Sequence, residues 1–126
     1  MREWILVALG GASGACARFG LSGFVLHRSV HGSFPFGTFV VNVLGCLLAG
    51  LLVGLAEKHH LLAPEVRVFL LTGLLGGFTT FSAFGVETVH LMRRGEYLVA
   101  GTYVSLSLLC GLLALWLAYW VIPLRR

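Results

Sequence analysis

Four long apolar stretches, separated by short polar segments, organise the chain. They cover residues Trp4–Leu26, Phe34–Ala56, Val66–Met92 and Tyr97–Ile122. A helix needs about 20 mainly apolar residues to cross the hydrocarbon core of a bilayer, and each stretch reaches that length. The pattern therefore predicts an all-α membrane protein with four transmembrane helices, in which residues 1–126 form a single domain.

The third stretch differs from the others because its middle contains residues that interrupt helices. Gly76 and Gly77 are adjacent, and together they make a continuous helix costly. Thr79, Thr80 and Ser82 follow, and their hydroxyl groups can replace lost main-chain hydrogen bonds. In hydrocarbon, irregular backbone persists only where protein buries it or where it faces a water-filled path. Because broken helices often expose main-chain groups to ions, we predict a broken third helix with an ion site at the break.

The first stretch combines small residues with one charge. Gly10 and Gly14, like Gly11 and Ala15, are four residues apart, a spacing that lets two helix backbones approach closely. Arg18 follows them, and an arginine near the middle of a span costs about 2.5–3.5 kcal/mol unless it is paired or hydrated. The alternative is a position nearer the interface, with the side chain extending outward to the headgroups.

Polar side chains also recur on the second and fourth stretches. Thr38 and Asn42 are four residues apart and share a helix face, as do Tyr103 and Ser107. Asn42 has two interpretations. It either makes an interhelical hydrogen bond worth about 0.6–2 kcal/mol, or lines a polar path where its amide group meets an anion. The broken third stretch favours the path.

Phe81 and Phe84 follow the predicted break at a spacing of three residues. Phenylalanines in a span normally pack or face lipid. An aromatic ring edge carries partial positive charge, however, and can solvate an anion where N–H donors are few. Glu87 lies further along the same stretch, where it is either interfacial or paired across an interface with a base such as Arg18.

Composition supports the membrane interpretation and argues against nucleic-acid binding. Hydrophobic residues make up 58% of the chain and charged residues 11%, and the mean hydropathy is +0.94. A soluble chain of this size could not bury so much apolar surface. The net charge of +4 comes from basic residues that lie mainly at the ends of the stretches, as headgroup anchors do. The expected surroundings are therefore membrane lipid.

The charges in the connections provide only a weak orientation signal. The side with both termini would hold five basic residues, Arg2, Lys58, Arg67, Arg125 and Arg126. The opposite side would hold three, Arg28, Arg93 and Arg94. Positively charged loops normally stay in the cytoplasm, and so small a bias allows insertion in both orientations. An antiparallel pair of subunits is therefore consistent with the sequence.

Enzymatic activity is not indicated. The chain has no aspartate for a Ser-His-Asp triad, no phosphate-binding loop and no clustered metal ligands. Its three cysteines, Cys16, Cys46 and Cys110, each fall within an apolar stretch and are interpreted as packing residues. Neutral donors, aromatic edges and Arg18 suit the permeation of a small anion.

Three segments resemble the bacterial Fluc (CrcB) fluoride channel family, and the resemblance extends over nearly the whole chain. The segments are Gly11–Phe19, Gly37–Gly45 and Gly76–Phe84. The resemblance implies an antiparallel, dual-topology homodimer in a bacterial inner membrane, with two pores that export cytoplasmic fluoride passively. It also implies pore residues on three of the spans: Asn42, Phe81, Phe84, Thr38, Ser82, Tyr103 and Ser107.

The same resemblance implies a structural, non-transported Na⁺ at the dimer centre, held by the main-chain carbonyls of Gly76 and Thr79 from both subunits. Unpaired carbonyls at the end of a half-helix are negatively polarised and suit a hard cation. The chain departs from the family pattern at Ala83 and at Gly111, where family members often have hydroxyl residues. Both departures affect the outer ends of the polar face.

The competing interpretation is a small, dual-topology, proton-coupled multidrug exporter. Such exporters use a glutamate within the first span, whereas this chain has Arg18 there and places Glu3 at the terminus. A purely structural membrane subunit is a further alternative, but it would not need polar side chains on three helices.

Overall fold

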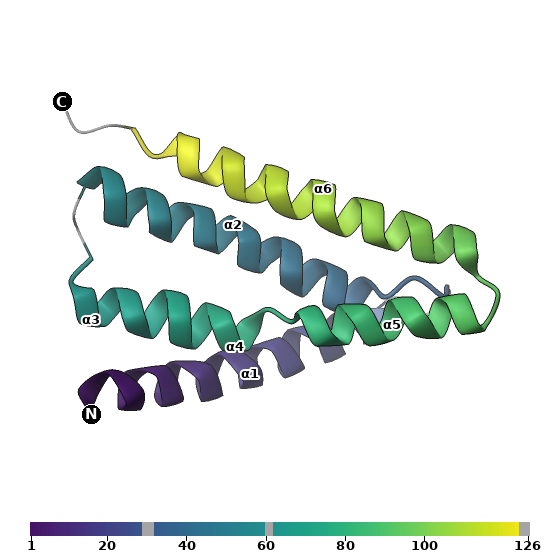
Figure 1. Ribbon diagram of the computed structural model, residues 1–126, viewed down its shortest axis with the longest axis horizontal. Helices are drawn as coiled ribbons and strands as arrows, with labels where there is room; N and C mark the ends of the chain where they lie inside the picture. Colours follow the sequence, from purple (N-terminus) through teal and green to yellow (C-terminus); the bar gives the residue numbers. More distant parts are fainter. Residues whose placement is uncertain (29–31, 60–61, 124–126) are drawn as a thin grey trace.

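The computed structural model describes residues 1–28, 32–59 and 62–123, and these residues are helical except at the connections and at one break (Figure 1). Helix α1 (Arg2–Arg28) and helix α2 (Phe36–His59) form the first two spans. The third span consists of α3 (Pro64–Arg67), η1 (Val68–Leu75), α4 (Gly76–Phe78) and α5 (Phe81–Arg93). Helix α6 (Tyr97–Val121) forms the fourth.

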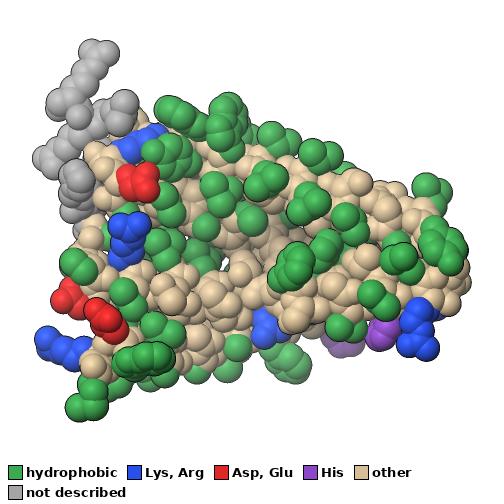
Figure 2. All heavy atoms as spheres, in the orientation of Figure 1, with side chains coloured by type: hydrophobic (Ala, Val, Ile, Leu, Met, Phe, Trp, Pro, Cys, Tyr) green, Lys and Arg blue, Asp and Glu red, His purple; other side chains and the backbone are tan. Residues whose placement is uncertain are grey.

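The prediction of four membrane spans is confirmed. The described residues contain four helical segments that are long and apolar enough to cross a bilayer, Arg2–His27, Phe36–Lys58, Pro64–Arg93 and Tyr97–Val121. Apolar side chains are spread over the middle of the surface in Figure 2, and most of the charged side chains lie near its two ends. The chain is therefore a multi-pass membrane protein. Arg125 and Arg126, which were counted in the charge bias, lie outside the described residues.

The helices form two close pairs, α1 with the third span and α2 with α6 (Figure 1). The first pair depends on glycine, as the spacing of small residues in α1 predicts. A side chain at Gly14 would collide with the carbonyl oxygen of Leu74, and one at Gly77 with that of Gly11. Backbones at this distance gain van der Waals contact that larger residues would prevent.

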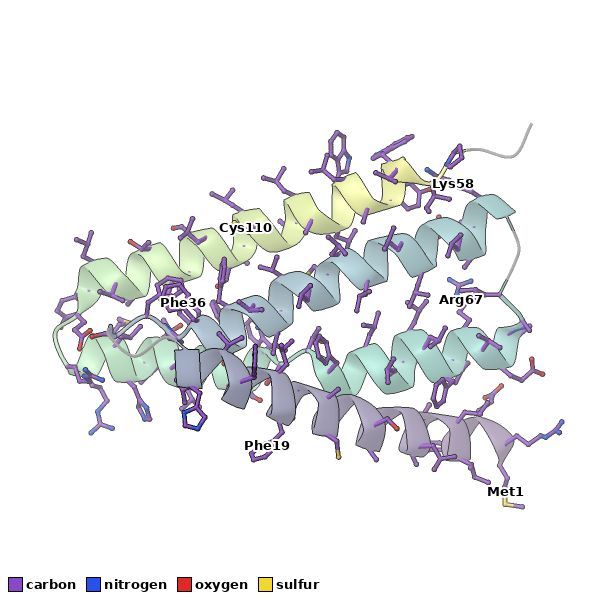
Figure 3. All side chains as sticks on the ribbon, turned by 180° about the vertical axis from the view of Figure 1, so that it is seen from behind. Met1, Phe19, Phe36, Lys58, Arg67 and Cys110 are labelled. Atoms are coloured by element: carbon purple, nitrogen blue, oxygen red, sulfur yellow. The ribbon has the colours of Figure 1, made fainter. Side chains whose placement is uncertain are left out.

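Lysine holds the second pair together at the end that carries the C-terminus. Lys58, in the last turn of α2, donates hydrogen bonds of 2.8 Å to the carbonyl oxygens of Tyr119 and Ile122. Figure 3 shows Lys58 at this end of α2, beside the last turns of α6. Carbonyls at the C-terminus of a helix lack intrahelical partners, and the helix dipole favours a positive charge there. Lys58 thus supplies both the donors and the charge.

The third span is broken, but the prediction that Gly76 and Gly77 interrupt it is wrong. Gly76 is helical, with φ −61° and ψ −38°. The break falls on Thr79 (φ −81°, ψ 157°) and Thr80 (φ −149°, ψ 120°), which are extended. Gly77 serves the contact with α1 instead, and packing against another helix offsets the low helix propensity of glycine.

The two threonines stabilise the ends that the break creates. The Thr79 hydroxyl donates to the carbonyl oxygen of Leu75 at 2.9 Å, in the last turn before the break. The Thr80 hydroxyl accepts a 3.2 Å hydrogen bond from the Ala83 N–H and so caps the N-terminus of α5. An N-cap of this kind contributes about 1 kcal/mol. Before the break, η1 is a stretch of π-helix, which has wider turns than an α-helix. Such stretches are rare in proteins overall, but they occur frequently at functional sites.

Replacing Gly77 with alanine is expected to destabilise the protein by about 1–3 kcal/mol, the usual cost of forcing an extra carbon into a packed contact. The added Cβ would meet the backbone of Gly11, which cannot rotate away as a side chain can. Gly101→Ala is the matched control, because a Cβ at Gly101 meets nothing within 4 Å. Thermal unfolding of the two purified variants in detergent measures the difference, and equal melting temperatures would contradict the expected contact.

Candidate functional site

Asn42 on α2 binds the main chain of the break from both sides. Its Nδ2 donates to the carbonyl oxygen of Thr80 at 3.0 Å, and its Oδ1 accepts from the Thr80 N–H at 2.9 Å. The paired bonds fix which end of the amide faces which group. They satisfy two main-chain groups whose exposure in the span would cost about 1–3 kcal/mol each. The Nδ2 group has a second N–H, which these bonds do not use.

Asn42 also diverts a hydrogen bond from the end of the half-helix. In a continuous helix the Thr80 N–H would donate to the carbonyl oxygen of Gly76. It donates to Asn42 instead, and in the described part of the chain no main-chain N–H beyond α4 replaces it at Gly76. The Gly76 carbonyl is therefore left available at the end of the half-helix.

A cavity of about 430 Å³, here called the break cavity, lies beside the interruption. It brings together six of the predicted site residues from three spans: Asn42, Gly76, Thr79, Phe81, Phe84 and Ser107. Figure 2 shows the molecule hollowed between the two helix pairs. The remaining lining is mostly apolar and includes Cys46 and Leu75. No carboxylate lines this cavity among the residues that the structure describes.

The two phenylalanines after the break are close to each other but differ in exposure. Their ring centroids are 5.7 Å apart and their planes are inclined by 37°. Phe84 also packs against Tyr103, with ring centroids 5.1 Å apart. Phe81, in contrast, is 82% exposed in the single chain. Phe81 thus contributes little to the core of the single chain.

A second group of predicted residues meets at Glu87. Thr38 donates its hydroxyl to Oε1 of Glu87 at 2.6 Å, and Tyr103 donates to Oε2 at 2.7 Å. Hydroxyl bonds to a carboxylate at these lengths are short and strong. Tyr103 is fully buried and Thr38 almost so. The sequence placed Thr38 and Tyr103 on a pore and assigned Glu87 no partner among them, so this cluster of three was missed.

The signal that could have revealed the cluster is the spacing along α5. Glu87 lies three residues after Phe84, on the same helix face, so a contact of Phe84 with α6 also directs Glu87 toward α6. What the sequence could not show is the rotation of α2, which brings Thr38 to the same carboxylate.

Arg18 does not pair with Glu87 within the subunit. Its Nε donates to the carbonyl oxygen of Gly77 at 3.2 Å. Arg18 and Glu87 nevertheless line one hollow of about 310 Å³, here called the Arg18 hollow, together with Thr38 and Thr80. The expectation that these two charges pair across an interface stays a prediction.

A further hollow of about 480 Å³ continues from Glu87 and Thr38 toward the connections, where Ser33 and Arg94 line it. Since Thr80 borders both the Arg18 hollow and the break cavity, polar side chains line a series of spaces from one helix end to the break. Ser82 stands apart, since its exposed hydroxyl contacts only Thr80, at 3.2 Å, among the hydrogen bonds of the described residues.

Main-chain carbonyls are the groups that could hold a metal ion here. Among the described residues, no three His, Cys, Asp or Glu side chains are grouped to bind one. Gly76 and Thr79, whose carbonyls end the half-helix, both line the break cavity. Oxygen donors suit hard cations, and carbonyls at a helix C-terminus carry partial negative charge.

Comparisons with known proteins identify the family. Residues 5–119 match the family described as CrcB-like protein, Camphor Resistance (CrcB). A "Fluoride-specific ion channel FluC" from Methylobacillus flagellatus is 52% identical over 94% of this chain and 93% of its own length. One from Nitratidesulfovibrio vulgaris is 50% identical, covering 93% and 94%, and one from Flavobacterium psychrophilum is 44% identical, covering 92% and 93%. The chain therefore belongs to the CrcB-like family.

Proposed function

We propose that the chain is a fluoride-specific ion channel that lets cytoplasmic fluoride leave a bacterial cell passively and so reduces its toxicity. The observation that carries the proposal is the break cavity, where the amide of Asn42 and the rings of Phe81 and Phe84 meet without a carboxylate. Neutral donors and ring edges stabilise an anion that has lost water. Relatives with about half of their residues identical are named as fluoride-specific channels.

In this proposal two sets of residues in each subunit form the pore, those that line the break cavity and those that meet at Glu87. The unused N–H of Asn42 and the edges of Phe81 and Phe84 replace water around fluoride in the break cavity. Thr38, Ser82, Tyr103 and Ser107 extend the path as polar contacts. Arg18 and Glu87 shape the electric field at its polar end, since the guanidinium attracts the anion and two hydroxyls hold the carboxylate in place. No covalent chemistry is involved, so the protein is not an enzyme.

The working unit is proposed to be an antiparallel homodimer in the inner membrane, each subunit being one four-helix domain. The exposure of Phe81 in one subunit supports this, because a second copy would cover that ring and close the open side of the cavity. The weak charge bias of the connections supports insertion of the two copies in opposite orientations. Labelling an N-terminal cysteine tag from each side of sealed vesicles tests it, and a single orientation would contradict it.

The proposal includes a structural Na⁺ between the subunits, and the carbonyls of Gly76 and Thr79 beside the break cavity support it. The ion supplies positive charge that holds two half-helix ends of equal sign together. Removing Na⁺ in favour of N-methyl-D-glucamine is expected to lower the melting temperature of the purified dimer. Sodium at a hundred times its dissociation constant would contribute about 2.7 kcal/mol. Identical melting curves and efflux rates in the two cations would contradict the sodium site.

The alternative function, a small proton-coupled multidrug exporter, needs a carboxylate that exchanges protons with a substrate site. Glu87 already accepts one hydroxyl hydrogen bond on each oxygen and does not line the break cavity. Among the described residues, no carboxylate therefore lines the break cavity, which is the substrate space in this proposal.

Fluoride efflux from proteoliposomes, followed with a fluoride electrode, tests the proposed function. The purified chain should release trapped fluoride without a pH gradient and should not release chloride. Efflux that requires a pH gradient, or equal release of the two halides, would favour the exporter or a nonselective pore.

A further inference from the structure

The polar face of α6 ends early in this chain. Tyr103 donates to Glu87, Ser107 follows four residues later on the same face, and Gly111 has no side chain to continue it. The hydroxyl oxygen of Ser107 is buried and has no hydrogen-bond partner among the described residues. An unpaired buried hydroxyl costs about 1–3 kcal/mol. Because Ser107 lines the break cavity, its unpaired hydroxyl indicates that a polar species occupies this cavity.

A side chain from α2 fills the space in front of Gly111. A Cβ added to Gly111 would meet the sulfur of Cys46 at 3.3 Å, and apart from its chain neighbours and the backbone of its own helix no other atom lies within 4 Å of it. Cys46 lies four residues after Asn42, so the two share a face of α2, and both line the break cavity with Ser107. The thiol therefore stands where a longer side chain at position 111 would project.

We propose that Cys46 is a permeation residue, whose S–H takes over for the missing hydroxyl at Gly111 and donates to fluoride as the ion passes Ser107. This inference rests on the proposed function of the chain as a fluoride channel. A thiol is a weak hydrogen-bond donor, and it is a donor nonetheless in a cavity whose remaining walls are largely apolar. The role differs from the packing role that the sequence alone indicated for this cysteine.

The other two cysteines provide matched controls. Cys16 is exposed on α1. Cys110 lies partly buried on α6, where Figure 3 labels it. Neither lines the break cavity. Removing either thiol should therefore leave fluoride efflux unchanged.

The first measurement compares efflux rates of single variants in proteoliposomes. Cys46→Ala is expected to slow fluoride efflux about three- to tenfold, the loss of one modest hydrogen bond. Cys16→Ala and Cys110→Ala should conduct as the unaltered protein does, and size-exclusion chromatography verifies that each variant keeps its assembly. Cys46→Ala at the unaltered rate would overturn the inference while leaving the proposed function intact.

The second measurement separates hydrogen bonding from filling of space. With the sulfur removed, a side chain at 111 has room, so Cys46→Ala/Gly111→Ser places a hydroxyl near the former position of the thiol. This variant should regain most of the lost rate, whereas Cys46→Ala/Gly111→Ala, which adds volume but no donor, should not. Equal rates in the two double variants would overturn the inference. Absence of efflux from the unaltered protein would instead remove the proposed function on which it rests.

Discussion

Replacing Phe81 with isoleucine is expected to reduce fluoride efflux to the leak of empty vesicles while leaving the protein folded. Isoleucine keeps most of the apolar surface but has no ring, so it cannot present the positively polarised edge that would replace water around the anion. Folding should be preserved because Phe81 is 82% exposed within the subunit and so contributes little to its core. Fluoride-electrode recordings on proteoliposomes measure the rate.

The control for this variant is Phe24→Ile on α1. Phe24 is 57% exposed and lines neither the break cavity nor the Arg18 hollow. Phe24→Ile makes the same chemical change away from the proposed pore, so this variant should release fluoride at the rate of the unaltered protein. Normal efflux through Phe81→Ile would refute the role of the ring edge, and a misfolded Phe81→Ile protein would contradict the expectation that this ring contributes little to the core of the subunit.

Much of the fold could be predicted because membrane helices are set by length and apolarity. The four spans follow from these two properties, and the close approach of α1 to the third span follows from the spacing of Gly10 and Gly14. Both are local patterns that need no knowledge of neighbouring elements. The π-helical stretch η1 had no such pattern and was not predicted.

The position of the break shows the limit of local patterns. Glycine propensity placed it at Gly76 and Gly77, but the close contact between Gly77 and Gly11 keeps this pair helical. The break moved to two threonines whose side chains could cap both ends. Which residues break a helix thus depends on what the neighbouring helix requires.

The candidate site, too, could be predicted only in part, because its geometry depends on how neighbouring helices pack. Asn42, Phe81, Phe84 and Ser107, which the family resemblance assigned to the pore, line one cavity, and their part in permeation stays a prediction. Spacing along one helix could indicate only which of them share a helix face. It could not set the rotation of α2 against α5 and α6, which brings Thr38 and Tyr103 to Glu87. The proximity of Cys46 to Gly111 depends on the same packing between helices and was likewise not predictable.

The structure also joins the two interpretations of Asn42 that the sequence left open. Its amide holds the main chain of the break, which is the structural interpretation, and keeps one N–H for the cavity that the break borders. By taking the Thr80 N–H away from Gly76, the same side chain leaves a carbonyl free at the proposed cation site. One residue therefore connects the fold of the third span, the proposed sodium ion and the proposed pore.

Replacing Asn42 with alanine is therefore expected to abolish fluoride efflux and sodium dependence together. The Thr80 N–H and C=O would both lose their partner, at a cost of about 2–6 kcal/mol for two unpaired groups. The chain can lower that cost by returning the Thr80 N–H to Gly76, which lengthens the half-helix and occupies the carbonyl that sodium would use. Melting curves recorded with Na⁺ and with N-methyl-D-glucamine should then coincide, whereas those of the unaltered protein should differ.

Thr102→Ala is the matched control for this variant. Thr102 also donates to a main-chain carbonyl, that of Leu98 at 2.8 Å, but within its own helix and on an exposed face. Its removal should change neither efflux nor the response to sodium, because that carbonyl keeps its helical partner. If Asn42→Ala kept the sodium-dependent shift while losing efflux, the amide would serve the pore alone, and the shared control of break and cation site would be wrong.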